Sequence, residues 1–231
     1  MSNEKPLRKI RSFVKRSGRL SKAQAIGLNE LWDDYGINPN GKLLNFNKLF
    51  LSPNNVTLEV GFGNGDSLLE MAIQNPNLNF LGIEVYEAGV GRLINEASKN
   101  KLTNLKIIKD DAVEVLNNNI PDDSISHFQL FFPDPWHKKR HHKRRIVQTS
   151  FLDLLTKKLK NNGIVHIATD WENYAEHIME TLESHSHFKN CAGDHIYSER
   201  PEQRPLTKFE NRGQKLGHGV WDIIFTNLKG G

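Results

Sequence analysis

A glycine-rich segment bounded by acidic residues has the composition and spacing of a ligand-binding loop. Residues 59–65 have the sequence Glu-Val-Gly-Phe-Gly-Asn-Gly and continue directly from an apolar run that begins at Val56. Glycines at such a place let the chain turn sharply after a strand and let its backbone approach a ligand closely. Glu84 lies 23 residues after Gly61, at the end of a second apolar run, where a carboxylate can accept both hydroxyls of a ribose. Glu59, Gly61, Gly63 and Glu84 are therefore candidate binding residues.

Two adenosine-containing ligands could bind such a loop. Dinucleotides prefer a small residue at the position that Asp66 occupies, and an acid such as Glu59 repels their pyrophosphate. S-adenosylmethionine has no phosphate and carries an ammonium and a sulfonium group, which an acid attracts. The pattern favours S-adenosylmethionine as the cofactor and leaves a dinucleotide as the alternative. Asp111, after a third apolar run, could contact the adenine ring or cap a helix, and the residues alone do not decide between these roles.

An aspartate between two prolines follows a fourth apolar run. Residues 131–136 have the sequence Phe-Phe-Pro-Asp-Pro-Trp, and the prolines restrict the backbone around Asp134, which suits a carboxylate that must be aimed. Ligands of parallel α/β sheets bind beyond the carboxyl ends of the strands, so we expect Asp134 to face the same crevice as the glycines. Trp136 could stack on a base or pack against the protein.

Positive charge is concentrated in two segments of a chain whose net charge is only +4. Residues 138–145, called the basic segment below, have the sequence Lys-Lys-Arg-His-His-Lys-Arg-Arg, and residues 1–24 hold eight Lys and Arg against one Glu. The remainder of the chain is therefore net acidic. Two basic segments on an acidic protein indicate a polyanionic partner such as a nucleic acid. His141 and His142, adjacent within a cationic run, suit phosphate contacts better than a metal.

Apolar runs that alternate with helical patterns predict the elements that position these residues. We expect strands at 56–60, 79–85, 105–109, 125–132, 164–168 and 220–225, with helices between most of them. One helix is expected to end at a cap formed by 161–163, and the next to begin with a capping box of Thr169 and Glu172. This alternation predicts an α/β fold with a doubly wound, mostly parallel sheet. Residues 51–231 would form that domain, preceded by a basic, partly flexible extension at 1–50.

Composition excludes several classes of protein. The single cysteine, Cys191, allows neither an internal disulfide nor a cysteine-ligated metal centre within one chain. The longest stretch without a charged residue, 71–83, is shorter than the ~18 apolar residues of a membrane span. The N-terminus lacks the apolar core of a secretory signal. We expect a cytoplasmic protein, a monomer or a homodimer, without a metal or a membrane anchor.

Several of these motifs occur together in one known family. Gly-Ile-Glu-Val at 82–85, Ala-Thr-Asp-Trp-Glu-Asn-Tyr at 168–174 and Arg-Pro-Leu-Thr-Lys-Phe-Glu at 204–210 accompany the glycine-rich loop and the Pro-Asp-Pro-Trp turn with its basic segment. In this order they resemble the bacterial tRNA (guanine-N7-)-methyltransferases over about residues 56–226. The resemblance implies a class I, Rossmann-like methyltransferase domain. It also implies methyl transfer from S-adenosylmethionine to N7 of guanosine 46 in the variable loop of tRNA.

The resemblance also implies roles for individual residues. Glu59, Glu84, Asp111 and Asp134 would bind S-adenosylmethionine beside Gly61 and Gly63, and Asp134 would be the catalytic residue. The tRNA substrate would contact Lys138, Asp170, Thr207, Lys208, Phe209 and Glu210. The RNA backbone would lie along Arg140, His141, His142, Lys143, Arg144 and Arg145. Without the resemblance, Asp170 would be interpreted as a helix cap and 207–210 as a polar loop.

Two other functions stay open on the sequence alone. Adenine-N6 methyltransferases carry an Asp/Asn-Pro-Pro-aromatic turn, whose order differs from the Pro-Asp-Pro-Trp found here. A non-catalytic RNA-binding protein that retains a cofactor fold is the other alternative. It is disfavoured because Glu59, Glu84, Asp134 and the three glycines all occur together.

Overall fold

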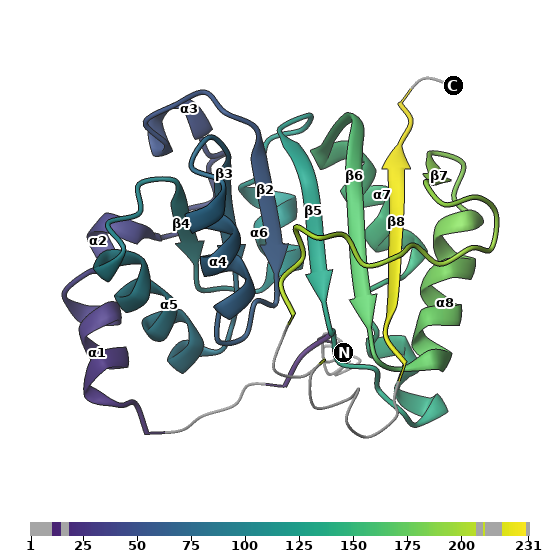
Figure 1. Cartoon of the computed structure of the whole chain (residues 1–231), viewed down its shortest axis with the longest axis horizontal. Helices are drawn as coiled ribbons and strands as arrows, with labels where there is room; N and C mark the ends of the chain where they lie inside the picture. The colour runs from purple at the N-terminus through teal and green to yellow at the C-terminus, as the bar shows by residue number, and fades with distance from the viewer. Residues whose placement is uncertain (1–10, 15–18, 207–209, 211–218, 230–231) are drawn as a thin grey trace, which may run out of the picture.

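An eight-stranded sheet forms the centre of the computed structural model, which describes residues 11–14, 19–206, 210 and 219–229. Within these residues the strand order is β1-β4-β3-β2-β5-β6-β8-β7. Strands β1 to β6 are parallel, and β8 is antiparallel to its neighbours β6 and β7. In Figure 1 the arrow of β8 points in the direction opposite to those of β2, β5 and β6. The strands are β1 (Gly36–Ile37), β2 (Val56–Val60), β3 (Asn79–Ile83), β4 (Leu105–Ile108), β5 (Ile125–Phe131), β6 (Leu159–Thr169), β7 (Phe188–Asn190) and β8 (Trp221–Asn227).

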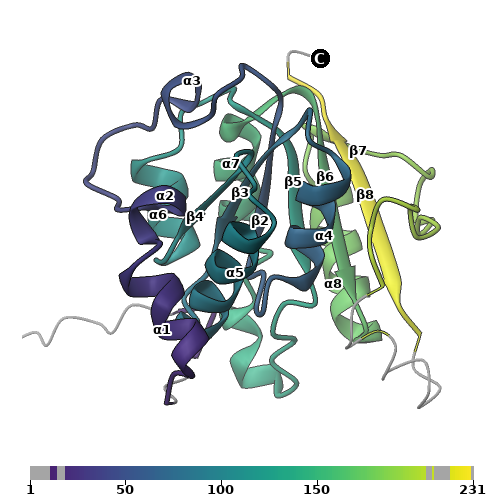
Figure 2. The same ribbon diagram turned by 60° about the vertical axis from the view of Figure 1, so that its left-hand side comes forward.

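Helices cover both faces of the sheet (Figures 1 and 2). Helices α4 and α5 pack on one face, with α1 lying on α5, and α6, α7 and α8 pack on the other. The α-helices are α1 (Lys22–Asn29), α2 (Trp32–Tyr35), α3 (Phe46–Leu49), α4 (Asp66–Gln74), α5 (Glu87–Lys99), α6 (Ala112–Asn118), α7 (Thr149–Lys158) and α8 (Glu172–Glu183). No helix within the described residues is long and apolar enough to cross a membrane.

The predicted α/β fold with a mostly parallel, doubly wound sheet is confirmed. Strands β2 and β3 are buried along their whole length, because helices cover both faces of the sheet. Such strands typically consist of near-continuous apolar runs and do not alternate between apolar and polar residues. All six predicted strands are present, the last of them as β8. Strands β1 and β7 were not predicted, since two and three residues carry too little pattern to be recognised.

The predicted helix cap at 161–163 is wrong. Helix α7 ends at Lys158, and the chain enters β6 directly at Leu159, which is fully buried and pairs with Ile125. Residues 161–163 lie within β6 at an irregularity in its pairing with β5, where Asn162 adopts a φ of 60°. The last helical carbonyls are satisfied by the amides of Asp123 and Ser124 from the preceding turn, so no glycine cap is needed.

The predicted capping box at Thr169 and Glu172 is also wrong. Thr169 is still part of β6, where it pairs with Trp221, and α8 begins three residues later at Glu172. The Thr169 hydroxyl accepts a hydrogen bond from the Trp171 amide at 3.3 Å, which is a local turn and not a helix cap.

Part of the predicted N-terminal extension is attached to the sheet. Strand β1 pairs with β4 at the sheet edge, and Tyr35, Ile37 and Phe50 are buried. Helix α1 crosses α5 so closely that a Cβ on Gly91 would stand 2.2 Å from the backbone oxygen of Gln24. The division of the chain at residue 50 stays a prediction, and residues 1–10 and 15–18 lie outside the described residues.

We expect Gly91→Ala to lower the free energy of unfolding by about 1–3 kcal/mol, although alanine is the better helix former. The added methyl group can be accommodated only if α1 moves away from α5. Urea denaturation of Gly91→Ala and of Asn95→Ala, which removes atoms from the same helix, measures the difference. Equal stabilities of the two variants would contradict the close approach of the helices.

Candidate active site

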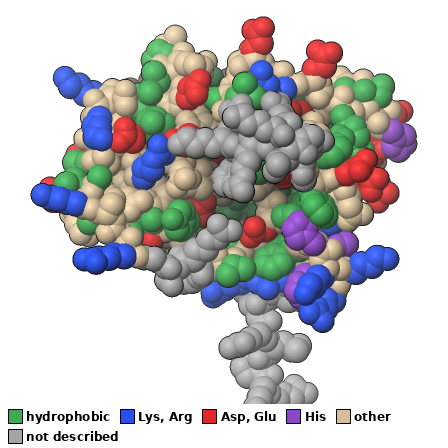
Figure 3. Space-filling view, turned by 60° about the horizontal axis from the view of Figure 1, so that its bottom comes forward, with side chains coloured by type: hydrophobic (Ala, Val, Ile, Leu, Met, Phe, Trp, Pro, Cys, Tyr) green, Lys and Arg blue, Asp and Glu red, His purple; other side chains and the backbone are tan. Residues whose placement is uncertain are grey.

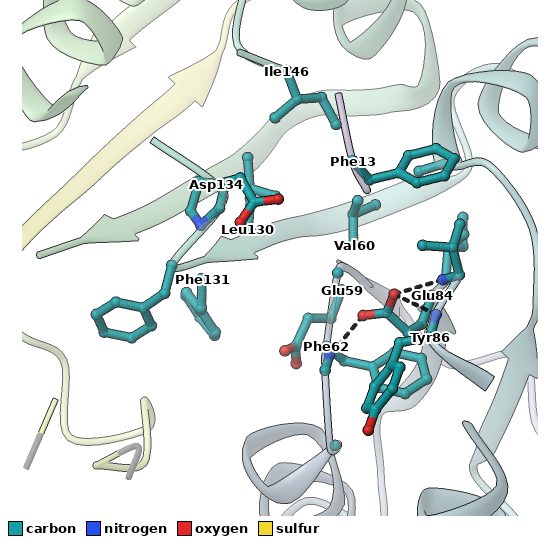
Figure 4. A pocket seen from close by; sticks show the side chains of 18 of the residues that line it. Phe13, Glu59, Val60, Phe62, Glu84, Tyr86, Leu130, Phe131, Asp134 and Ile146 are labelled. Atoms are coloured by element: carbon teal, nitrogen blue, oxygen red, sulfur yellow. Dashed lines mark hydrogen bonds between the residues drawn. The ribbon is translucent and has the colours of Figure 1, made fainter. Parts of the chain in front are cut away.

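A pocket of about 380 Å³ opens at the carboxyl ends of β2, β3 and β5. Its walls are formed by the glycine-rich loop after β2, by Glu84 after β3 and by the 131–134 turn after β5. Figure 3 looks onto this end of the molecule. Among the pocket residues labelled in Figure 4, Asp134 and Glu84 lie on opposite sides, and Glu59 lies between them. The expected meeting of these three strand ends at one crevice is therefore observed.

The glycine-rich loop requires its glycines for backbone reasons. Gly61, Gly63 and Gly65 have φ angles of 73°, 58° and 76°, in the left-handed region that other residues rarely adopt. A Cβ on Gly61 or Gly63 would meet no atom within 4 Å, so conformation and not space demands glycine at these two positions. At Gly65 a Cβ would also stand 2.8 Å from the Leu93 side chain. The loop thus leaves open space above two glycines that line the pocket.

The Glu84 carboxylate joins the glycine-rich loop to the end of β3. One oxygen accepts a hydrogen bond from the Gly63 amide at 2.8 Å, and the other accepts from Val85 and Tyr86 at 2.6 and 2.9 Å (Figure 4). A carboxylate oxygen has two lone pairs, so the oxygen bonded to Gly63 keeps one for a ligand hydroxyl. Glu84 both orders the loop and presents an acceptor to the pocket.

Glu59 carries a buried carboxylate at the end of β2. Its side chain is 2% exposed, and Oε2 has no hydrogen-bond partner within the described residues. Burial, together with repulsion from Glu84, raises the pKa of Glu59 to about 8. The free protein therefore holds a proton on Glu59 near neutral pH, and a positively charged ligand group would favour its release.

Asp134 lies in the turn formed by residues 131–136, called the Asp134 turn below, which is fixed on both sides. The residues two before and two after it, Phe132 and Trp136, both have positive φ angles, 53° and 49°. The Phe132 amide donates to the backbone oxygen of Ala168 in β6 at 2.8 Å, which holds the turn against the sheet. Asp134 is exposed and lines the pocket, so its carboxylate is available to a ligand there.

The basic segment follows this turn and forms a 3₁₀ helix from Lys139 to Arg144. Lys138, Lys139, Arg140 and Lys143 are exposed, whereas His141 and His142 are half-buried. In Figure 3, Lys, Arg and His side chains gather along the lower border of the face that holds the pocket. The exposed cations are free to meet phosphates there.

Arg144 and Trp136 contact the N-terminal segment 11–14. The Arg144 guanidinium lies 3.9 Å from the centre of the Trp136 ring and donates to the backbone oxygens of Arg11 and Phe13. The indole of Trp136 donates to the oxygen of Ser12 at 3.1 Å. Of the two roles left open for Trp136, the structure shows packing.

Arg145 differs from the other residues predicted to contact RNA, because the structure places it inside the protein, and its contact with RNA stays a prediction. Its side chain is only 3% exposed, because the guanidinium lies 4.7 Å from the centre of the Tyr174 ring. It donates to the backbone oxygen of Pro135 at 2.9 Å and to the side-chain oxygen of Asn173 at 2.9 Å. Arg145 thus fixes the end of the Asp134 turn, and little of its side chain is exposed.

Comparison with known proteins gives a consistent result. A family model described as "Putative methyltransferase" matches residues 53–223. The tRNA (guanine-N(7)-)-methyltransferase of Shewanella amazonensis is 52% identical over 223 residues, which cover 96% of this chain and 94% of that protein. The enzyme of the same name from Psychromonas ingrahamii is 53% identical over 228 residues, 99% and 93% of the two chains. The chain belongs to the bacterial tRNA (guanine-N7-)-methyltransferase family.

Solved structures agree on the fold of this family member. The 16S rRNA methyltransferase KamB superposes with a TM-score of 0.60 at 16% identity, covering 79% of this chain and 92% of KamB. The aminoglycoside resistance methyltransferase NpmB1 gives a TM-score of 0.55 at 12% identity over the same shares. At these identities the likeness concerns the class I methyltransferase fold alone.

The residues expected from the family resemblance to contact substrate lie in different surroundings. Lys138 is exposed and Asp170 is half-buried after β6, whereas Thr207, Lys208 and Phe209 lie outside the described residues. Glu210 is buried, and both of its carboxylate oxygens accept hydrogen bonds from Arg204. The structure thus shows Glu210 in an internal ion pair, and its contact with the substrate stays a prediction.

Asp111 caps helix α6 in this member of the family, with its side chain accepting from the Val113 amide at 3.0 Å. It lines a neighbouring cavity of about 320 Å³, while Asp110 and Ala112 line the larger pocket. The capping role is thus observed, and contact of Asp111 with adenine stays a prediction.

Three residues of the N-terminal segment line the pocket although the sequence did not predict them there. Ser12, Phe13 and Val14 line the pocket from the N-terminal segment, and Figure 4 shows Phe13 beside Val60 and Ile146. They precede the glycine-rich loop by more than forty residues, so only the tertiary structure brings them there.

We expect Arg145→Ser to lower the free energy of unfolding by about 2–4 kcal/mol, because the Pro135 oxygen loses its buried donor. Arg140→Ser, which changes an exposed member of the basic segment, is expected to stay within about 0.5 kcal/mol of the parent protein. Urea denaturation followed by circular dichroism measures both. If Arg145→Ser matched Arg140→Ser, the structural role of Arg145 would be excluded.

Proposed function

We propose that this protein transfers the methyl group of S-adenosylmethionine to N7 of a guanosine in tRNA, namely guanosine 46 of the variable loop. One observation carries the proposal: among the described residues that line the pocket, the charged ones are all acidic and none is Lys or Arg. A pyrophosphate would find no cation there, whereas a sulfonium and an ammonium would meet Glu59, Glu84 and Asp134. The substrate named for the relatives, tRNA, is a polyanion, and it accounts for the exposed basic segment beside that pocket.

The residues present fit the cofactor. Glu59, whose buried Oε2 has no partner in the part of the chain that is described, would accept the cationic methionine end. Glu84 would accept a ribose hydroxyl above the Gly61–Gly63 backbone. S-adenosylmethionine supplies an electrophilic methyl group when bound. The dinucleotide alternative is disfavoured by Glu59, which would lie next to its phosphates, whereas Glu84 would suit the ribose of either ligand.

Asp134 would act on the guanine. Guanine N7 has an in-plane lone pair and carries no proton, so it attacks the methyl carbon without a general base. The N7–carbon bond forms as the carbon–sulfur bond breaks, and the positive charge passes to the guanine ring. A carboxylate held at the pocket surface stabilises that developing charge and orients the base. Alignment of the reacting atoms supplies the remainder of the acceleration.

The exposed cations at Lys138, Lys139, Arg140 and Lys143 would contact the phosphates of the tRNA. They follow Asp134 within nine residues, so an RNA bound along them passes the mouth of the pocket. Since tRNA acts in the cytoplasm, this substrate would require a cytoplasmic location for the protein.

Methyl transfer from radiolabelled S-adenosylmethionine to unmodified tRNA tests the proposal directly. We expect 7-methylguanosine after nuclease digestion, and none with a transcript in which guanosine 46 is replaced by adenosine. N6-methyladenosine would indicate the adenine-modifying alternative, and binding of tRNA without transfer would indicate the non-catalytic one.

Asp134→Asn is expected to reduce single-turnover methyl transfer by ~10²-fold or more, because the neutral amide cannot match the gain of a carboxylate beside a guanine that becomes cationic. The affinity for tRNA should fall much less. Asp110→Asn, another exposed pocket acid, serves as the control and should stay within about threefold of the parent at saturating cofactor. A rate for Asp134→Asn within threefold of the parent would show that alignment alone drives the reaction.

The affinity for S-adenosylmethionine is expected to rise as the pH rises from 6.0 to 7.5. In the free protein Glu59 is protonated below its pKa of about 8, and binding of a cation requires release of that proton. Each pH unit then strengthens binding by up to ~10-fold, below the range in which the cofactor's own amino group titrates. Glu59→Gln should bind more weakly and with little pH dependence. Calorimetry in buffers of different ionisation enthalpy counts the released proton, and zero release at pH 7 would exclude this role of Glu59.

Replacing Arg140 and Lys143 together by Ser should reduce the slope of log tRNA affinity against log salt concentration by about 1–2, since fewer counterions are released on binding. Lys99→Ser with Lys101→Ser removes the same charge from exposed positions at the end of α5 and should leave the slope unchanged. Identical slopes for the two double variants would show that the basic segment does not contact the RNA backbone.

A further inference from the structure

Four charged or titratable side chains form a buried cluster that the proposed reaction does not use. The buried ion cluster consists of Arg204, Glu210, Asp222 and His166, each no more than 7% exposed. The Arg204 guanidinium donates to both oxygens of Glu210 at 2.6 and 2.9 Å and to both oxygens of Asp222 at 2.7 and 2.8 Å. The imidazole of His166 lies 2.6 Å from Asp222 Oδ1.

Stability alone is a weak explanation for such a cluster. Desolvation of several charges costs as much as their attraction returns, and apolar residues of the same volume commonly stabilise a protein equally well. The hydrogen bonds of Arg204 and His166 hold the pKa of Asp222 below its ordinary value despite burial, so the carboxylate stays ionised inside the protein. The geometry that the cluster imposes on its neighbours is therefore a better explanation for it than its contribution to stability.

The buried ion cluster packs against the two residues that begin the Asp134 turn. The Arg204 guanidinium carbon lies 5.9 Å from the centre of the Phe131 ring and 5.8 Å from that of Phe132. The His166 ring meets Phe131 edge-on at 5.0 Å. The cluster thus touches both phenylalanines and lines no part of the pocket itself within the described residues.

Phe132 needs such support because its backbone is strained. A φ of 53° costs of order 1 kcal/mol or more for a residue with a bulky side chain, and it persists only when the surroundings leave no alternative. The Phe132 amide bonds to Ala168, whose strand partner in β8 is Asp222. Backbone and side chain of Phe132 are therefore held by the same two strands that hold the cluster.

We propose that Arg204 is a positioning residue for methyl transfer: by joining Glu210 and Asp222 it fixes Phe131 and Phe132, and through them the direction of the Asp134 carboxylate. This inference rests on the proposed role of Asp134 at the guanine. It gives Glu210 a function through Arg204 in place of substrate contact. The five donors of a guanidinium lie in a rigid fork that can serve two carboxylates at once, which a lysine ammonium cannot reproduce.

The test is a double-variant cycle of Arg204→Lys with Asp134→Asn, read by single-turnover methyl transfer to tRNA. Arg204→Lys keeps the charge and loses the fork, and we expect the rate to fall about 10-fold or more, since a small misplacement near reacting atoms is that costly. The dissociation constants of cofactor and tRNA should stay within twofold. In the Asp134→Asn background the same change should cost less than about twofold, because the carboxylate that Arg204 aims is already neutralised.

A matched control separates positioning from stability. Asp122→Asn breaks another ion pair, at the opposite end of β5 and β6, and leaves the buried ammonium of Lys158 without its carboxylate. It should lower the urea midpoint and leave the single-turnover rate unchanged. If Arg204→Lys does not fold, Glu210→Gln replaces it in the cycle, with an expected fall of about threefold that likewise disappears beside Asp134→Asn.

The outcomes distinguish this inference from the proposed function. If Asp134→Asn is slow and the fold-reductions in rate caused by Arg204→Lys and Asp134→Asn multiply in the double variant, the positioning role alone is overturned. Weakened cofactor binding in Arg204→Lys would show a general structural role and overturn it as well. An unaltered rate in Asp134→Asn would instead remove the catalytic role of Asp134, and the inference with it.

Discussion

A carboxylate that is buried at the end of the central strand β2, without a cationic partner among the described residues, is the constraint around which the site is built. Glu59 is held there by a strand that is paired on both sides, and Glu84 stands at the end of the next strand. Burial, and in addition the repulsion from Glu84, raises the pKa of Glu59, which is why Glu59 takes up a proton in the free protein. The fold cannot relieve this repulsion, because its strand ends bring no Lys or Arg into the pocket lining that is described. A ligand that brings its own positive charge relieves it.

The remaining charges of the site are separated accordingly. Acids line the pocket, and the basic segment begins at Lys138, four residues beyond Asp134. A methyl transfer to guanine N7 moves a positive charge from the cofactor to the base, so it is favoured inside an acidic pocket. The phosphates of the RNA, which such a pocket would repel, find their partners outside it. One short turn connects the two regions, and its position therefore determines whether cofactor and RNA meet.

The sequence was sufficient for the features that depend on local pattern. Apolar runs located the parallel strands, and the rule that ligands bind at their carboxyl ends brought Glu59, Glu84 and Asp134 together correctly. Features that depend on tertiary partners were not predictable. Thr169 precedes a helix as a cap does, but it is paired with Trp221 in the sheet. Arg145 has the composition of its exposed neighbours, and only the Tyr174 ring and the Pro135 oxygen make it internal. Glu210 likewise has the sequence context of an acid in a polar loop, and only the structure shows its hydrogen bonds with Arg204.

Both ends of the Asp134 turn are held by buried arginines, and this arrangement explains how an exposed carboxylate can still be aimed. Arg204 packs against Phe131 and Phe132 at one end, and Arg145 binds the Pro135 oxygen at the other. The proline rings restrict φ between these points. A guanidinium suits both places because it supplies several donors in one plane and stacks on aromatic rings at the same time. The orientation of Asp134 is thus determined by residues that lie behind the turn, and a chain with every pocket residue intact can still lose activity through them.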